Sequence, residues 1–266
     1  MESLSFLICP FLACIALVLI HAYFGIHILQ RGIIFVDLAM AQFIGIGIAL
    51  SFYLAYENHY ILALLFASLG AIVFAFSKKV EKLVQLEAFI GVVYVFSFTT
   101  ALIILGQSPH GSEEFNSILN GNILWVSYRE VAFAYLLYAL IGLFHYLLRK
   151  QFFAITFEGK QNSFMEFLFF FTFGLVLVKS VVMAGVLTVF SFLIIPSLIG
   201  RLFTRKFSKS LLIGYCVGTL ATFIAIVISF KYDLPTSPVI VMLMSITFFG
   251  LLIFKTIKSK NLVRGA

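Results

Sequence analysis

Charged residues are scarce in this chain, and their scarcity decides the class of protein. Only 11% of the 266 residues are Asp, Glu, Lys or Arg, whereas a soluble domain carries about a quarter. The hydrophobic share is 62% and the mean hydropathy is +1.13. Apolar stretches of about 20 residues, the pattern of membrane-spanning helices, recur along the whole length. The composition excludes a soluble protein and predicts an all-α polytopic membrane protein.

Catalytic and nucleotide-binding motifs are missing as well. The segment closest to a phosphate-binding loop is EGKQN, residues 158–162, which lacks the first Gly and the Ser or Thr that follows the Lys. The sequence contains no H-E-x-x-H pair for zinc and no G-x-S-x-G turn for a nucleophilic serine. An enzyme therefore has no motif to support it, and no cofactor is predicted.

Nine apolar stretches are predicted to cross the bilayer. They follow one another from the start of the chain to its end, so residues 1–266 are predicted to form a single transmembrane domain. An odd number of crossings places the two termini on opposite sides of the membrane. The stretches are Leu4–Leu29, Ile33–Tyr56, Tyr60–Ser77, Ala88–Gly106, Glu130–Leu148, Ser163–Val178, Val181–Gly200, Leu211–Phe230 and Pro238–Phe254.

The sixth and seventh stretches are separated only by a short connection that contains Lys179. The seventh contains Pro196, which removes one backbone hydrogen bond and usually bends a transmembrane helix. Helices broken near the middle of the membrane are typical of transport pathways. A bend that only shapes the packing is the alternative.

The distribution of basic residues predicts the orientation. Lys and Arg are enriched in cytoplasmic loops. If the N-terminus is outside and the C-terminus is cytoplasmic, 15 of the 18 basic residues fall on the cytoplasmic side, all except Arg129, Lys179 and Lys231. The net charge of +7 is therefore explained by topology, and no nucleic-acid partner is predicted.

One carboxylate and one amide interrupt the second stretch, RGIIFVDLAMAQFIGIGIAL. Ala41, Gly45 and Ala49 are spaced four apart, so that one face of this helix permits close approach of another helix. Asp37 falls on the same face and is predicted to point into the bundle, where a carboxylate is costly and usually functional. Gln42 lies about 140° around the helix and faces elsewhere.

A structural role is the alternative for Asp37, because the start of a helix stabilises an anion and Arg31 is near in sequence. Glu87 and Glu166 also begin helices, and for them the structural role is favoured. Packed or interfacial positions are favoured over metal ligation for three histidines in the apolar stretches: His21, His27 and His145.

Five segments match known motifs in a fixed order. QRGIIFVDLAMAQFIGIGIALSF, Gln30–Phe52, is similar to a second transmembrane helix. LEAFIGVVYVFSFTTALIIL, Leu86–Leu105, is similar to an acid-Ala-x-Ile-Gly helix, and NSILNGNILWVS, Asn116–Ser127, to the loop after it. VMAGVLTVFSFLIIPSLIGRLF, Val182–Phe203, resembles a Val-Gly-x-Leu-Leu…Pro helix, and DLPTSPVIVM, Asp233–Met242, a Leu-Pro-x-Gly-Pro turn. Together they resemble the membrane permeases of bacterial metal-ion ABC transporters, the zinc, manganese and iron uptake family.

This resemblance implies a fold of the cobalamin-importer type in the bacterial cytoplasmic membrane. It implies three protein partners: a separate ATP-binding subunit, an extracytoplasmic metal-binding protein, and a second permease copy in a homodimer or a pair. A separate ATPase also explains why this chain contains no phosphate-binding loop.

Two loops are candidates for contact with these partners. The inner loop Arg149–Asn162 is predicted to form a short helix at the membrane surface, where the fold places its coupling element. Its Phe157 and Glu158 are similar to the family's Phe-Asp-x-Glu and are predicted to contact the ATPase. The outer loop Gln107–Arg129 carries His110, Glu113 and Glu114. These residues either contact the binding protein, lie on the ion path or belong to a solvated acidic loop.

The sequence departs from the zinc permeases at the predicted metal path. Their second helix carries Asp-x-x-x-His, whereas here the Asp is shifted and Gln42 falls where the His would align. Imidazole suits zinc, while carboxylate and amide oxygens suit harder ions such as manganese. Asp37 and Gln42 are the candidate metal ligands, and the missing His weakens the assignment to zinc. Ser237 also replaces the family's Gly between Pro235 and Pro238.

The sequence thus predicts the permease subunit of an ABC importer for a divalent transition metal. An ion-coupled secondary carrier without an ATPase is one alternative, although such carriers usually show an inverted repeat and none is visible. An intramembrane enzyme is the other alternative, and it requires a facing catalytic pair within the membrane.

Overall fold

The computed structural model describes residues 2–56, 58–81, 83–108, 111–121 and 123–264, and throughout this part the secondary structure is helical. This confirms the all-α prediction. The elements are α1 (Glu2–Arg31), α2 (Val36–Tyr53), α3 (His59–Val80), α4 (Leu86–Leu105), α5 (Gly111–Asn120), the 3-10 turn η1 (Ile123–Trp125), α6 (Tyr128–Leu147), α7 (Arg149–Phe157), α8 (Ser163–Phe203), α9 (Phe207–Tyr232) and α10 (Thr236–Arg264).

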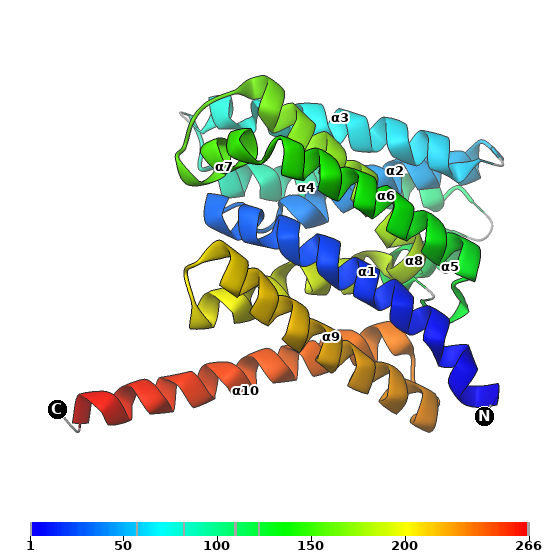
Figure 1. The fold of residues 1–266 in the computed structure, drawn as a ribbon. Helices are drawn as coiled ribbons and strands as arrows, with labels where there is room; N and C mark the ends of the chain where they lie inside the picture. Colours follow the sequence, from blue (N-terminus) through cyan, green and yellow to red (C-terminus); the bar gives the residue numbers. More distant parts are fainter. Residues whose placement is uncertain (1, 57, 82, 109–110, 122, 265–266) are drawn as a thin grey trace.

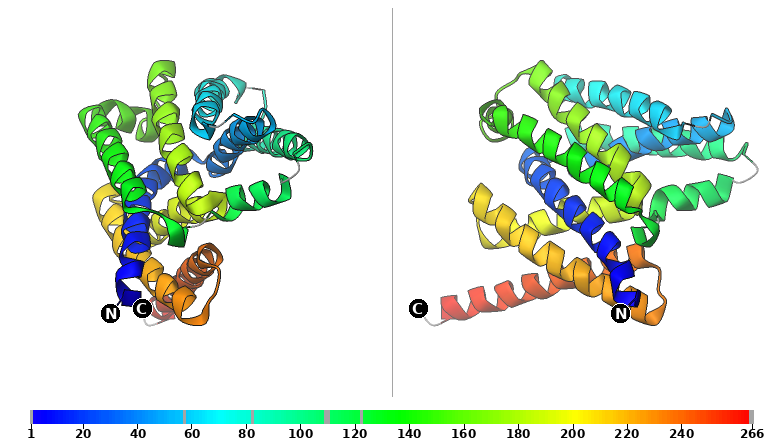
Figure 2. Two further views of the ribbon diagram at one scale, coloured as in Figure 1. Left: turned by 90° about the vertical axis from the view of Figure 1, so that its right-hand side faces the viewer. Right: turned by 45° about the vertical axis from the view of Figure 1, so that its right-hand side comes forward.

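Eight helices of the described chain are long and apolar enough to cross a membrane. The predicted sixth and seventh stretches both lie in α8, whose Gly185 has non-helical dihedral angles of φ 75° and ψ 160°. The chain runs to one end of the bundle before Gly185 and returns after it, so that α8 contributes two crossings (Figures 1 and 2). The two termini lie at opposite ends of the bundle, as nine crossings require.

The sequence predicts that the connection between these two stretches contains Lys179, but the break in α8 lies elsewhere. Lys179 is helical and buried, and its ammonium lies 5.7 Å from the ring centroid of Phe133. The helix reverses at Gly185 because another glycine meets it there: a Cβ on Gly185 would collide with the backbone of Asn120 and Gly121. The reversal therefore depends on a backbone-to-backbone contact with the segment that follows α5.

We expect Gly185→Ala to destabilise the protein by more than about 1–3 kcal/mol, the usual cost of a residue held in a sparsely populated backbone region. The added Cβ would also displace the Asn120–Gly121 backbone. The measurement is the Tm of the purified protein in detergent. Gly250→Ala is the matched control, because a Cβ there meets no atom within 4 Å. An equal Tm for the two variants would contradict this account of Gly185.

Close helix packing involves the second crossing, as predicted, but at a different glycine. The predicted small face is buried, with Ala41 1% and Ala49 0% exposed. A Cβ on Gly45, however, would meet only the side chain of Gln42, whereas a Cβ on Gly47 would collide with the backbone of Leu62 in α3. The close approach of α2 and α3 therefore occurs at Gly47, and α8 packs against both helices.

Basic side chains gather at the end of the bundle where α1 and α8 finish. Arg201 donates a hydrogen bond to the side chain of Gln30 over 2.9 Å, and Arg31 is bonded to α7 and α8 beside it. The same end carries Arg149 at the start of α7. This grouping is consistent with the bias of Lys and Arg on which the predicted orientation rests.

Candidate functional site

Asp37 is a deeply buried carboxylate in the first turn of α2. The residue is 1% exposed, and its Oδ1 has no hydrogen-bond partner within the described chain. Burial of a carboxylate oxygen without a hydrogen bond costs several kcal/mol by order of magnitude. The start of α2 offsets part of this cost through its backbone N–H groups. The placement matches the prediction that Asp37 points into the bundle.

Arg31 does not neutralise Asp37, although the sequence places it only six residues away. Its guanidinium instead donates to Glu166 Oε2 over 2.6 Å and to Thr156 Oγ1 over 3.0 and 3.1 Å. It also lies over the ring of Phe169, 4.1 Å from its centroid. The positive charge nearest in sequence is thus committed to α7 and α8.

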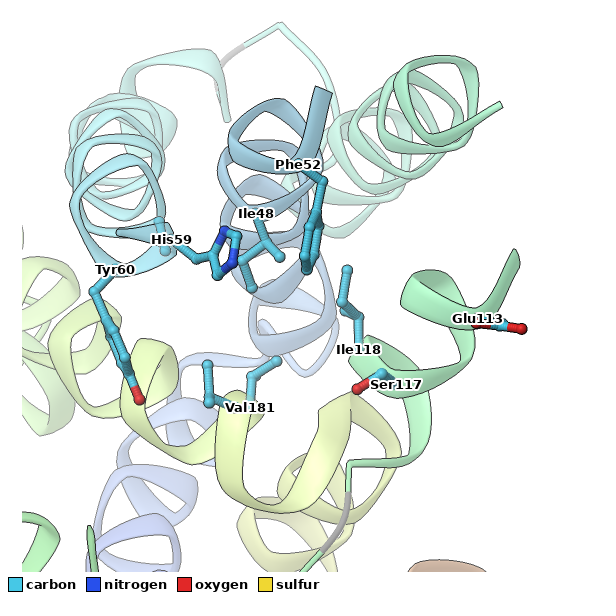
Figure 3. Close-up of a pocket in the computed structure, with 10 residues that line it drawn as sticks. Ile48, Phe52, His59, Tyr60, Glu113, Ser117, Ile118 and Val181 are labelled. Carbon is cyan, nitrogen blue, oxygen red and sulfur yellow. The ribbon is translucent and has the colours of Figure 1, made fainter. Parts of the chain in front are cut away.

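A cavity opens at the far end of the helix face that carries Asp37. Ile44 and Ile48 lie seven and eleven residues after Asp37, so they share its face, and Ile48 lines the cavity. The rise between Asp37 and Ile48 is about 16 Å. The cavity measures about 380 Å³. Figure 3 shows it between α2, α3, α5 and α8, with Val181 of α8 as its floor.

His59 is the polar group of this cavity that the sequence reading missed. Its Nδ1 is 2.6 Å from Ser51 Oγ, and its ring lies 4.3 Å from that of Phe52. Figure 3 shows the imidazole turned toward the cavity. The available signal was a histidine two residues after an acid in the short link ENHY between two apolar stretches. Only the approach of α5 and α8 makes that position part of a cavity.

Of the other predicted path and outer-loop residues, the two whose side chains the structure describes, Gln42 and Glu113, do not converge with Asp37. Gln42 is 3% exposed and lies on a different side of α2, as predicted. Glu113 lines the cavity, but its carboxylate points away from it (Figure 3). His110 lies outside the described residues, as does the side chain of Glu114. Among the residues that the structure describes, no group of three or more His, Cys, Asp or Glu is arranged to hold a metal.

The predicted inner surface helix is present as α7, with Phe157 at its end. The Phe157 side chain is 36% exposed, and its inner side packs on the rings of His27 and Phe207 at 5.7 and 6.1 Å. Glu158 is exposed and pairs with Lys160 over 2.8 Å, which raises the pKa of that ammonium. Both residues thus lie at the surface where the sequence places the ATPase contact.

A buried polar cluster anchors α7 to the membrane helices. Thr156 Oγ1 accepts from Arg31 and lies 2.8 Å from Nδ1 of His27. Because the guanidinium can only donate, the threonine hydrogen is available to the imidazole. Arg31 extends the cluster to Glu166 in the first turn of α8. One threonine of α7 is therefore tied to α1 and, through Arg31, to α8.

Glu87 and His145 take part in packing interactions. Glu87 Oε1 accepts from the backbone N–H of Phe35 over 3.2 Å and so satisfies a donor at the start of α2. His145 is bonded to the hydroxyls of Tyr23 and Thr172 over 3.0 and 2.8 Å.

Residues 3–255 match the model of the ABC 3 transport family. The chain belongs to this family. A manganese transport system membrane protein of Listeria monocytogenes is 23% identical over 261 residues, covering 94% of this chain and 91% of that protein. A Haemophilus influenzae protein named a probable iron transport system membrane protein is 25% identical over 243 residues, covering 88% and 85%.

The ABC 3 chain also shares its fold with a solved structure. PsaBC from Streptococcus pneumoniae in complex with Fab aligns with a TM-score of 0.76 and 21% identity, over 92% of this chain and 90% of that one. The predicted membership of the metal ABC permeases is thereby confirmed. A permease of this family is a transport subunit, not an enzyme.

Proposed function

We propose that this permease is the membrane subunit of an ABC importer that moves a divalent transition metal ion, zinc, manganese or iron, across the bacterial cytoplasmic membrane. The observation that carries the proposal is the family match over residues 3–255. Relatives named for manganese and for iron support a metal as the cargo. The cation-binding group that the membrane interior offers is Asp37, which is buried and has an oxygen with no hydrogen-bond partner.

In this proposal the ion enters at the cavity beside His59 and follows the Ile48–Ile44 face of α2 to Asp37. An imidazole and then a carboxylate give successive donors that accept a range of divalent metals. Since Asp37 has no ion-pair partner in the described chain, binding an ion requires no salt bridge to be broken. Conduction also requires that each site release the ion. A site with few ligands favours this release. Gln42 is the secondary ligand, on a different side of α2 from Asp37.

The partners follow from the same proposal. ATP hydrolysis belongs to a separate subunit that docks on α7 through Phe157 and Glu158, at the cytoplasmic end. A metal-binding protein delivers the ion at the opposite end. It contacts the predicted outer loop through His110, Glu113 and Glu114. A second permease copy completes the pore. The N-terminus is then outside and the C-terminus cytoplasmic.

We expect Phe157→Ala to weaken assembly with the ATPase and to reduce ATP-driven metal uptake, because the exposed edge of this ring is the part of α7 offered to the partner. The measurement is co-purification of the ATPase with the tagged permease, together with uptake in cells. Phe164→Ala is the matched control: Phe164 begins α8 at the same end and is 63% exposed. Intact assembly and uptake with Phe157→Ala would refute this docking site.

The cargo is tested by the total zinc, manganese and iron of metal-limited cells with and without the gene. Selective loss of one metal from cells without the gene identifies the substrate. An unchanged content of all three metals would overturn the proposed cargo.

A further inference from the structure

A second large groove, of about 590 Å³, runs along α1 on the face that carries His27 of the buried polar cluster, and its Tyr23 lies one turn before that histidine. Its floor is α1, and its two walls are α6 and α9, which flank α1 in Figure 1. Each helix contributes one stripe of side chains at a spacing of three or four residues, such as Leu19 and Tyr23 from α1, Gly142 and Tyr146 from α6, and Leu211 and Tyr215 from α9.

The groove is apolar inside and is lined by five tyrosines. The hydroxyl of Tyr135 donates to the Leu12 carbonyl, that of Tyr138 is bonded to Ser180, and that of Tyr23 to His145. These hydroxyls are satisfied within the protein, so the rings are left to form an apolar wall. Tyrosine rings with an apolar body and a polar tip are typical of the membrane interface.

The length of the groove matches one leaflet of the bilayer. Its α6 stripe runs from Tyr135 to Tyr146, a rise of about 16 Å. Half of the hydrocarbon core is about 15 Å thick. The volume also falls within the ~300–1,000 Å³ of small-molecule sites.

A positive charge stands at one end of the groove. Arg149, the first residue of α7, lines this end, and its guanidinium lies 4.6 Å from the ring centroid of Tyr146. Two acidic residues near α7 are already bonded to bases: Glu158 to Lys160 and Glu166 to Arg31. Arg149 is thus offered to an external anion at the end of the bundle where basic residues gather. Basic pockets between transmembrane helices recognise anionic lipid headgroups.

We propose that this groove binds an anionic phospholipid, with one acyl chain between α6 and α9 and the phosphate at Arg149. The guanidinium forms paired hydrogen bonds with phosphate oxygens. The acyl chain covers the apolar side chains of α1, α6 and α9 that line the groove. The site is separate from the metal path, whose cavity is lined by α2, α3, α5 and α8 and shares no residue with the groove, and it does not depend on the identity of the metal.

The test is native mass spectrometry of the full-length permease in detergent, after incubation with phosphatidylglycerol or with phosphatidylcholine of the same acyl chains. Wild-type protein is expected to retain phosphatidylglycerol in preference to phosphatidylcholine. Arg149→Gln is expected to remove this preference. Lys150→Gln, the same charge change at the neighbouring residue that does not line the groove, is expected to keep it.

A second pair of variants tests the acyl chain. A Cβ on Gly142 meets no atom within 4 Å, so Gly142→Leu is expected to fold and to fill the groove. It should lose the retained phosphatidylglycerol, whereas Gly250→Leu, equally open but on α10, should keep it. Retention by Arg149→Gln and Gly142→Leu at the wild-type level would overturn the proposal. Equal retention of the two lipids by the wild-type protein would also overturn it. If Gly142→Leu converts a dimer to a monomer without a change in bound lipid, the groove belongs to the interface with a second copy and the proposal is wrong.

Discussion

Asp37→Asn is expected to abolish metal uptake while the permease remains folded in the membrane. The substitution keeps the shape of the side chain and removes its charge, which is the property that a cation on the path requires. Loss of even a supporting partner of a metal ligand costs about 10–100-fold in affinity or activity, so loss of the ligand itself should lower the uptake rate by more than about tenfold. The fold should not suffer, because the carboxylate has an unsatisfied buried oxygen and stabilises nothing through it.

The measurement is the zinc, manganese and iron content of metal-limited cells in which the variant replaces the wild-type gene, with the Tm of the purified protein alongside. Asp233→Asn is the matched control. It makes the same chemical change at the other aspartate of the chain, in the exposed turn between α9 and α10. Its left-handed backbone, with φ 52° and ψ 45°, is one that asparagine also adopts. This control should transport at the wild-type rate.

The outcomes separate the path from the cargo. Wild-type uptake by Asp37→Asn would take the carboxylate off the route, even if deletion of the gene lowers one metal. A Tm lowered in parallel with uptake would assign Asp37 a structural role, the alternative that its position at a helix start suggests. Loss of one metal with an unchanged Tm is the result that the proposed path requires.

The fold was largely predictable because its main determinant is local. Runs of about 20 apolar residues cross a bilayer wherever they stand in the chain. Nine such crossings place the N-terminus and the C-terminus on opposite sides of the membrane. The reversal in α8 was misplaced because hydropathy alone favours a break at the charged Lys179. The actual break, at Gly185, depends on Gly121, which is 64 residues away in sequence and carries no local signal of that contact.

In the candidate site, too, the features set by local sequence were predictable and those set by contacts between distant helices were not. The burial of Asp37 follows from the apolar stretch and the small residues around it, and both are local. The cavity at His59 was missed because α2, α3, α5 and α8 form it together. The partner of Arg31 was missed for the same reason. Asp37 is near it in sequence, but α7 and α8 bring Thr156 and Glu166 to its guanidinium.

Arg31→Met is expected to destabilise the permease by about 3–5 kcal/mol, the cost of removing one partner from a buried ion pair. The Arg31 and Glu166 side chains are each 4% exposed, so water cannot replace the lost guanidinium. Thr156 would lose its donors at the same time, and α7 would be held less firmly on α1. The measurements are the Tm in detergent and the rate of tryptic cleavage after Lys160, which lies just beyond α7.

Two comparisons make this prediction specific to the buried pair. The double variant Arg31→Met/Glu166→Met should recover much of the lost stability, since a buried ion pair replaced by apolar side chains is often neutral or stabilising. Lys160→Met, which breaks the exposed pair with Glu158 (side chains 70% and 57% exposed), should leave the Tm unchanged, because surface ion pairs contribute little. If the double variant recovers its Tm but α7 is still cleaved rapidly, the pair supports the fold and the bonds of Arg31 to Thr156 hold α7. If Arg31→Met alone keeps the wild-type Tm and cleavage rate, the cluster does neither.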